Sequence, residues 1–301
     1  MIELKNEKIA IPVVLFAGLL WSFGPLVVRY MDQPGLVPWQ YIFARGLTIF
    51  FLLNLYLFFE EGKNFYKNYF KIGVSGLIGG CGLGIAMITF IYSITNTSAA
   101  VTLLCLAAMP FFTALLGFLF LKEKISLNVW VAIVIATIGI VIMAIGNNEK
   151  NSLIGFVFGM TSSIGFSIFS VSLRWRKETP KFTTVSIAGL FCAIVALIFI
   201  IKTESPFLST SYNGALFSLH GTLVCMGLIL YSIASKAIPA AELTLLSLTE
   251  VIGGIFWVWL PLFGINEIPS TNTIVGGFFL FMSIIYYSLT IKTNRRFIAL
   301  N

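Results

Sequence analysis

The sequence has very few charged residues. Only 10% of its 301 residues are charged, 58% are hydrophobic, and the mean hydropathy is +0.97. A soluble domain of this composition would have too little polar material to cover its surface. The chain also lacks a G-x-x-x-x-G-K-S/T phosphate-binding loop and an H-E-x-x-H motif, which argues against ATP-driven transport and zinc proteolysis within it. The composition indicates an integral membrane protein.

Cysteine and histidine are scarce as well. The four cysteines, Cys81, Cys105, Cys192 and Cys225, each lie inside an apolar segment and form no C-x-x-C pair. This pattern fits neither a disulfide framework nor a zinc site, and buried small apolar side chains are the simpler interpretation. His220 is the only histidine. We therefore expect no metal ion and no other cofactor.

Ten apolar segments are long enough to cross a membrane as helices, which takes about 20 residues. The first follows Lys5 and Lys8 as in a signal peptide, but it lacks a small-x-small cleavage site and is interpreted as a retained helix. The connections are short, so no soluble domain is expected. The predicted spans are 9–30, 38–59, 70–92, 98–121, 128–146, 153–174, 182–201, 212–234, 240–263 and 272–291.

The distribution of cations predicts the orientation of these spans. With a cytoplasmic N-terminus, the outer side receives only Arg29, Lys150 and Lys202, and Arg45 lies within a span. Cations concentrate in cytoplasmic loops, so we expect both termini in the cytoplasm and a multi-pass protein of the inner (plasma) membrane. The net charge of +7 is then explained by cations at the cytoplasmic face of the membrane, so we expect no nucleic-acid partner. The cytoplasmic cations are Lys5, Lys8, Lys63, Lys67, Lys71, Lys122, Lys124, Arg174, Arg176, Lys177, Lys181, Lys236, Lys292, Arg295 and Arg296.

The two halves of the chain contain similar sequence segments in the same order. Each half has five spans, an odd number, so duplicated halves must insert in opposite orientations. We expect two five-helix repeats, residues 1–149 and 150–301, with a site at their interface, which is a recurring plan of transporters. The echoing segments are Ser98-Ala-Ala-Val-Thr, Met109-Pro110 and Glu123-Lys-Ile-Ser126 in the first half, and Pro239-Ala-Ala-Glu-Leu-Thr, Glu250-Val251 and Glu267-Ile-Pro-Ser270 in the second.

These motifs, in this order, resemble the drug/metabolite transporter (DMT) superfamily in its ten-helix EamA-like branch. The resemblance covers nearly the whole chain and implies a bundle around a central cavity lined by spans one, three, four, six, eight and nine. It also implies transport of small metabolites such as amino acids. About three extra residues between Trp259 and Glu267 depart from the family pattern and predict an irregular outer end of span nine. The residues that carry the family resemblance are Leu20-Trp21-Ser22, Phe43-Ala-Arg45, Ala99-Ala100, Pro110, Lys122-Glu123-Lys124, Leu248-Thr-Glu250-Val251, Trp257-Val-Trp259 and Glu267-Ile-Pro-Ser270.

Glu250 is the main candidate for a functional residue, because it lies near the middle of the ninth span. A carboxylate at that depth costs on the order of 3 kcal/mol on insertion scales and usually faces a cavity or a partner. At helical spacing, Ser247, Gly253, Gly254 and Trp257 share its face. We favour a helix that lines a substrate site. The alternative is a packing helix whose Glu250 has a structural partner.

Three other spans carry further candidates for substrate binding. Trp21 precedes Gly24 and Pro25, and a helix break there would suit either a cavity or a simple kink. Thr102 and Met109 lie on the face of span four that corresponds to Glu250, with Met109 at the echoing position. Tyr92, at the outer end of span three, suits a gate or an aromatic belt equally well.

Arg45 and His220 are polar residues inside predicted spans. The family resemblance gives Arg45 a structural role, with Asp32 or loop carbonyls as partners, and contact with a ligand carboxylate is the alternative. A lone buried histidine is often hydrogen-bonded to a backbone carbonyl, but His220 could also relay protons together with Glu250.

The candidate residues together predict a secondary transporter that works by alternating access, as a monomer or homodimer. We expect a small zwitterion, such as an amino acid, or an organic cation, because Glu250 can accept an ammonium group and Trp21 or Trp257 can offer it a ring face. Glu250 either holds that cation or carries a proton that couples transport to the gradient. An intramembrane enzyme would need a second acid at similar depth, and a channel or receptor would need more polar spans.

Overall fold

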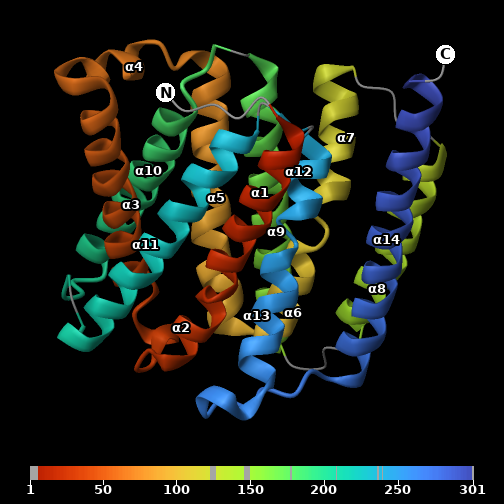
Figure 1. The fold of residues 1–301 in the computed structure, drawn as a ribbon. Helices are drawn as coiled ribbons and strands as arrows, with labels where there is room; N and C mark the ends of the chain where they lie inside the picture. Colours follow the sequence, from red (N-terminus) through yellow and green to blue (C-terminus); the bar gives the residue numbers. More distant parts are fainter. Residues whose placement is uncertain are drawn as a thin grey trace.

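The computed structural model describes residues 6–122, 127–145, 150–176, 178–207, 209–235, 237–238 and 240–299. These residues form helices joined by short connections, with no strand in any of these ranges. Helix α1 begins and α14 ends at the same end of the bundle (Figure 1). The expectation of an all-helical membrane protein is confirmed. The predicted motif Glu123-Lys-Ile-Ser126 lies outside the described residues.

The helices follow one another along the chain with few residues between them. Three of the elements, η1 to η3, are short stretches of 3₁₀-helix. The bounds are α1 Glu7–Ser22, α2 Gly24–Tyr30, η1 Pro34–Leu36, α3 Pro38–Glu61, η2 Gly62–Tyr66, α4 Lys67–Phe70, α5 Gly73–Asn96, α6 Ala99–Leu106, α7 Met109–Leu121, α8 Leu127–Ile145, α9 Lys150–Trp175, α10 Lys181–Lys202, α11 Ser211–Ala234, α12 Ala240–Leu246, α13 Thr249–Trp259, η3 Pro261–Phe263 and α14 Thr271–Ala299.

Each of the ten predicted spans coincides with a helix or with a pair of half-helices. Eight helical stretches of the described chain are long and apolar enough to cross a membrane. The other two predicted spans correspond to α8 and α14, whose apolar stretches are shorter in the part that the structure describes. The predicted irregularity after span nine is present, because α13 ends at Trp259 and is followed by η3 and by Gly264 with a φ of 71°.

Close packing of helix pairs holds the bundle together. Helix α5 packs along α9, α3 along α10, α1 along α11 and α8 along α14. The backbones approach closely where glycines face each other, as Gly82 does Gly165 and Gly46 does Gly189. A Cβ on Gly46 would lie 2.7 Å from the carbonyl oxygen of Gly189, so no larger residue fits there without movement. Small residues at such crossings compensate for the missing hydrophobic driving force in lipid.

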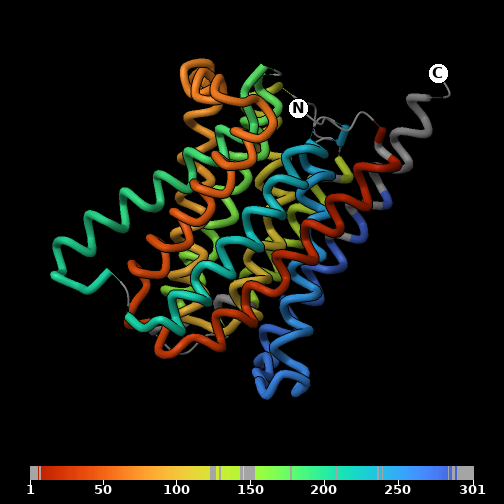
Figure 2. Tube along the Cα trace, turned by 60° about the vertical axis from the view of Figure 1, so that its left-hand side comes forward, coloured from red at the N-terminus to blue at the C-terminus, as the bar shows by residue number. Residues whose placement is uncertain are grey.

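Three of the spans are broken near their middle. Span one breaks at Phe23 between α1 and α2, span four at Ala107 and Ala108, and span nine at Ser247 and Leu248. Proline follows the first two breaks at Pro25 and Pro110, as expected from its missing N–H group. Figure 2 shows that α2 and the turn after α13 lie at the same end of the bundle, opposite the start of α1.

Candidate functional site

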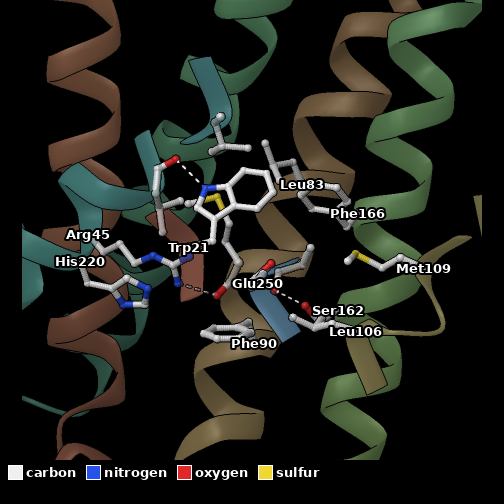
Figure 3. Close-up of a pocket in the computed structure, with 14 residues that line it drawn as sticks. Trp21, Arg45, Leu83, Phe90, Leu106, Met109, Ser162, Phe166, His220 and Glu250 are labelled. Carbon is white, nitrogen blue, oxygen red and sulfur yellow. Dashed lines mark hydrogen bonds between the residues drawn. The ribbon is translucent and has the colours of Figure 1, made fainter. Parts of the chain in front are cut away.

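A cavity of about 60 Å³ lies where the broken helices meet. This volume holds a few water molecules. Its walls come from α1, α3, α5, α6, α7, α9, α11 and α13, which include all six spans expected from the family resemblance, together with α3 of span two. Figure 3 shows the lining side chains. They are Trp21, Arg45, Leu83, Ala86, Met87, Phe90, Leu106, Met109, Ser162, Phe166, His220, Val224, Leu228 and Glu250.

Glu250 contributes the negative charge of the cavity. The break in span nine makes it the second residue of α13, where its N–H group donates to the carbonyl oxygen of Ser247 over 3.0 Å. An acidic side chain in the first turn of a helix is favoured by the helix dipole. The side chain is partly buried and makes no hydrogen bond within the described residues. Its oxygens are therefore available to a solute in the cavity.

Arg45 contributes the positive charge of the cavity from α3. The side chain is only 5% exposed. Its Nη1 lies 3.5 Å from the carbonyl oxygen of Met87, at the limit of a hydrogen bond, and its Nε has no partner in the described chain. The guanidinium lies 5.7 Å from the centre of the Phe90 ring. The expected partners were Asp32 and loop carbonyls, but this carbonyl belongs to helix α5, and Asp32 hydrogen-bonds through its backbone to Asn213.

Arg45 and Glu250 do not form an ion pair with each other within 4 Å in the described structure, although both line the cavity (Figure 3). Charged groups removed from water are costly unless they are paired and fully hydrogen-bonded. These two charges are only partly compensated by the protein. The arrangement therefore suits a solute that carries charge of its own.

His220 lies beside the charged pair on α11 and is 2% exposed. Its Nδ1 shares a hydrogen bond with the hydroxyl of Tyr41, and its ring lies against Gly24 next to the break in span one. No hydrogen bond joins His220 to Glu250 among the described residues. The side chain is thus held by tyrosine instead of a backbone carbonyl.

Trp21 and Met109 line the cavity next to two of the breaks. The indole Nε1 of Trp21 donates to the carbonyl oxygen of Val224 over 3.2 Å, and its ring packs against Phe166 and Tyr231 at 5.8 and 5.7 Å between centroids. Because its polar atom is already bound to the protein, Trp21 offers a solute only its ring. Met109 is 2% exposed and begins α7.

The other four candidate residues lie outside the cavity lining. Thr102 shares a hydrogen bond with Ser93, Ser247 donates to the carbonyl oxygen of Thr244, and Tyr92 packs against Trp39 and Phe158. Trp257 donates to Ser22 and stacks on Phe23. Ser247 precedes the break in span nine, so regular helical spacing does not connect it to Glu250, whereas Trp257 lies on α13 with Glu250 but two turns further along.

Helix α9 is span six, which the family resemblance placed in the cavity wall, but none of its residues was among the candidates named from the sequence. Ser162 and Phe166 line the cavity four residues apart on one face of this helix. Nearby, Ser163 donates to the carbonyl oxygen of Cys105 over 2.5 Å and Ser167 to that of Met109 over 3.1 Å, which satisfies backbone groups at the break in span four. The signal was present as a row of serines inside an apolar span.

The fold and the site define a polytopic membrane protein with a small charged cavity at the meeting point of discontinuous helices. Residues 8–145 match the model of the EamA-like transporter family. Over this first part of the sequence, the chain is therefore similar to EamA-like membrane transporters. The expectation of a transporter and not an enzyme is confirmed.

Relatives with transporter names extend the similarity beyond the first half. The chain is 25% identical over 252 residues to an uncharacterized transporter of Helicobacter pylori strain J99, covering 80% of each chain. It is 24% identical over 224 residues to the pseudopaline exporter CntI of Pseudomonas aeruginosa strain UCBPP-PA14, covering 73% of this chain and 75% of that one. A solved crystal structure shares the fold, with a TM-score of 0.64 at 16% identity over 95% of this chain and 99% of that chain.

Proposed function

We propose that the protein is a secondary transporter that moves a small zwitterion, such as an amino acid, or an organic cation across the inner membrane by alternating access. The observation that carries this proposal is the cavity between Arg45 and Glu250, where neither charge is fully satisfied by the protein. Discontinuous helices that meet at a central site are a recurrent feature of secondary transporters. A solute larger than the 60 Å³ cavity requires the surrounding helices to move.

The pattern of helix packing supports the proposed inverted repeat of residues 1–149 and 150–301. Pairing of α5 with α9 (spans three and six) has a counterpart in α1 with α11 (spans one and eight). Likewise, the pairing of α7 with α9 (spans four and six) corresponds to that of α13 with α1 (spans nine and one). The pairs α3 with α10 (spans two and seven) and α8 with α14 (spans five and ten) are each their own counterpart. Exchanging each span with the one five spans later thus preserves the contacts. The excess of cations on one side supports cytoplasmic termini.

The two charges favour a zwitterion over a simple cation. Glu250 can accept an ammonium group, and the unpartnered Nε of Arg45 can donate to a carboxylate. The rings of Trp21, Phe90 and Phe166 can cover the rest of the solute. A strictly anionic substrate such as a sugar phosphate would leave Glu250 facing a like charge.

The experiment is a thermal-shift and binding screen of the purified protein with three versions of each candidate solute. An amino acid, its methyl ester and the corresponding amine differ in the carboxylate alone. Because a ligand stabilises the state that it binds, we expect a larger shift with the amino acid than with the other two. The variant Arg45→Gln should remove this difference, while Arg176→Gln, an exposed arginine outside the cavity, should preserve it.

The ratio of the affinities for the amino acid, its ester and the amine does not depend on whether Arg45→Gln lowers the overall stability of the protein. Loss of a charge-assisted hydrogen bond worth about 1.5–3 kcal/mol corresponds to a roughly tenfold to hundredfold weaker affinity for the amino acid. Tight binding of phosphate esters without any effect of amines would contradict the proposed substrate class.

A further inference from the structure

At the end of the bundle where α2 lies, an ion pair joins the last turn of span one to the connection that follows span nine. Arg29, in the last turn of α2, donates from its Nε to Oε2 of Glu267 over 2.8 Å, and Glu267 lies in the connection between η3 and α14. The side chains are 22% and 21% exposed, so the pair is shielded from most of the solvent. Span one and span nine are thereby joined directly.

Each member of the pair also binds the end of another helix. Arg29 donates from Nη1 to the carbonyl oxygen of Ile94 over 2.8 Å and from Nη2 to that of Thr97 over 3.1 Å, at the C-terminal end of α5. Glu267 accepts a hydrogen bond of 2.5 Å from the N–H group of Ala99, at the N-terminal end of α6. A cation at a helix C-terminus and an anion at a helix N-terminus both complement the helix dipole. Two side chains thus connect four elements.

These four elements continue the walls of the cavity. Helix α2 follows α1 with Trp21, α5 carries Phe90, α6 carries Leu106, and the connection with Glu267 follows α13, which carries Glu250. At 1.5 Å per residue, the ion pair lies roughly 6–14 Å beyond the cavity along the helix axes.

The space between the cavity and the ion pair is filled by side chains. Trp257 stacks on Phe23 with 5.1 Å between ring centroids, and its Nε1 donates to Ser22 over 3.0 Å. Gly254 packs against Leu103 and Pro25. A solute could leave the cavity at this end only if these elements separated.

We propose that Arg29 and Glu267 form a latch that holds the cavity closed at the α2 end and that must open in every transport cycle. This inference rests on the alternating access proposed above. The contacts involve α2, α5, α6 and the segment after α13 together, so separation of any one of them from the others breaks charge-assisted hydrogen bonds. The pair therefore sets the balance between the closed and the open form of this end.

The first test measures access to the cavity from each side of the membrane. In a background with all four cysteines replaced by alanine, Leu106→Cys provides a reporter thiol in the cavity wall. A membrane-impermeant thiol reagent is applied to intact cells and, separately, to inverted vesicles. We expect Arg29→Gln and Glu267→Gln to accelerate labelling roughly fivefold to tenfold from the α2 side only, because the open form gains population. Lys202→Gln, which removes an exposed charge outside the latch, should not change the rate.

The second test holds the latch closed. In the double variant Arg29→Cys/Glu267→Cys, a short bis-methanethiosulfonate reagent should stop transport, and reduction should restore it, while solute binding in detergent persists. Unchanged labelling in both single variants, or undiminished transport by the cross-linked protein, would overturn the proposal. Failure of every solute to bind the unmodified protein would instead contradict the proposed function, since the labelling measurement needs no solute.

Discussion

At the scale of single residues, the carboxylate of Glu250 has two possible roles in transport. It lies in the cavity without a hydrogen-bonding partner in the described residues, and the buried Arg45 lines the same cavity. In one role it stays ionised and binds the ammonium group of the solute. In the other it gains a proton in one conformation and releases it in the next, with His220 close by as a second titratable group. We favour the first role or a combination of both.

The variant Glu250→Gln separates these roles, because glutamine keeps the volume and hydrogen-bonding capacity of the side chain but cannot ionise. If Glu250 is a counter-ion, binding of an amine should weaken roughly tenfold to hundredfold at every pH. If it is a proton carrier, binding and exchange should persist while accumulation driven by a pH gradient disappears. Binding by calorimetry and uptake into proteoliposomes, with and without a pH gradient, measure the two outcomes.

The matched control is Glu178→Gln, which neutralises an exposed glutamate outside the cavity. It should behave as the unmodified protein in both assays. Wild-type binding and transport by Glu250→Gln would show that this carboxylate serves neither role.

At the scale of helices, the breaks in spans one, four and nine define the site. A broken helix exposes backbone groups that have no water to bind within a membrane. Serine and threonine side chains satisfy several of them, as Ser163 does for Cys105 and Thr249 does for Leu246 over 3.3 Å. The breaks are therefore part of the packed structure and not signs of local disorder.

Removal of one of these hydroxyl groups should destabilise the protein measurably. Ser163→Ala leaves the carbonyl oxygen of Cys105 without this donor, and hydrogen bonds in membrane proteins contribute about 0.6 kcal/mol on average and up to about 1.7. We expect a melting temperature lower by a few degrees. Thr161→Ala, which removes an exposed hydroxyl bonded within the same helix, is the control and should lower it less. Equal effects would show that Ser163 does not support the break.

The sequence predicted only the break in span one, where Pro25 removes a hydrogen-bond donor from the helix. Pro110 in span four was noted as a motif residue, but no break was predicted from it. The break at Ser247 and Leu248 has no proline. At this break Thr249 contacts α1, where Gly18 leaves room for the chain, and the sequence of span nine alone does not indicate this neighbouring helix.

At the scale of the whole molecule, the proposed orientation follows from charge and from an even number of spans. Reporter fusions at Asn301 and at Asn148, both outside the described residues, test it. We expect a cytoplasmic signal from the first and an outer signal from the second, since five spans separate the start of the chain from Asn148. Signals from the same side of the membrane would refute two inverted halves of five spans.

The sequence by itself determined the class of protein, the positions of the spans and the importance of a few residues within them. Apolar segments of this length indicate membrane helices. Within them, Trp21, Arg45, His220 and Glu250 stood out as aromatic or polar residues, and Met109 as the position that corresponds to Glu250 in the other half. All five line the cavity. Intramembrane charge is costly, so its presence in a span is informative even without a structure.

Only the tertiary structure decided which residues face one another. Regular helical spacing placed Ser247 and Trp257 beside Glu250, but Ser247 lies before the break in span nine, and Trp257, two turns further along α13, binds Ser22 and does not line the cavity. The pairing of Arg29 with Glu267 joins residues 238 positions apart, through a contact that neither local sequence contains. Periodicity describes one helix at a time, whereas a cavity and its closure arise from the packing of several helices against each other.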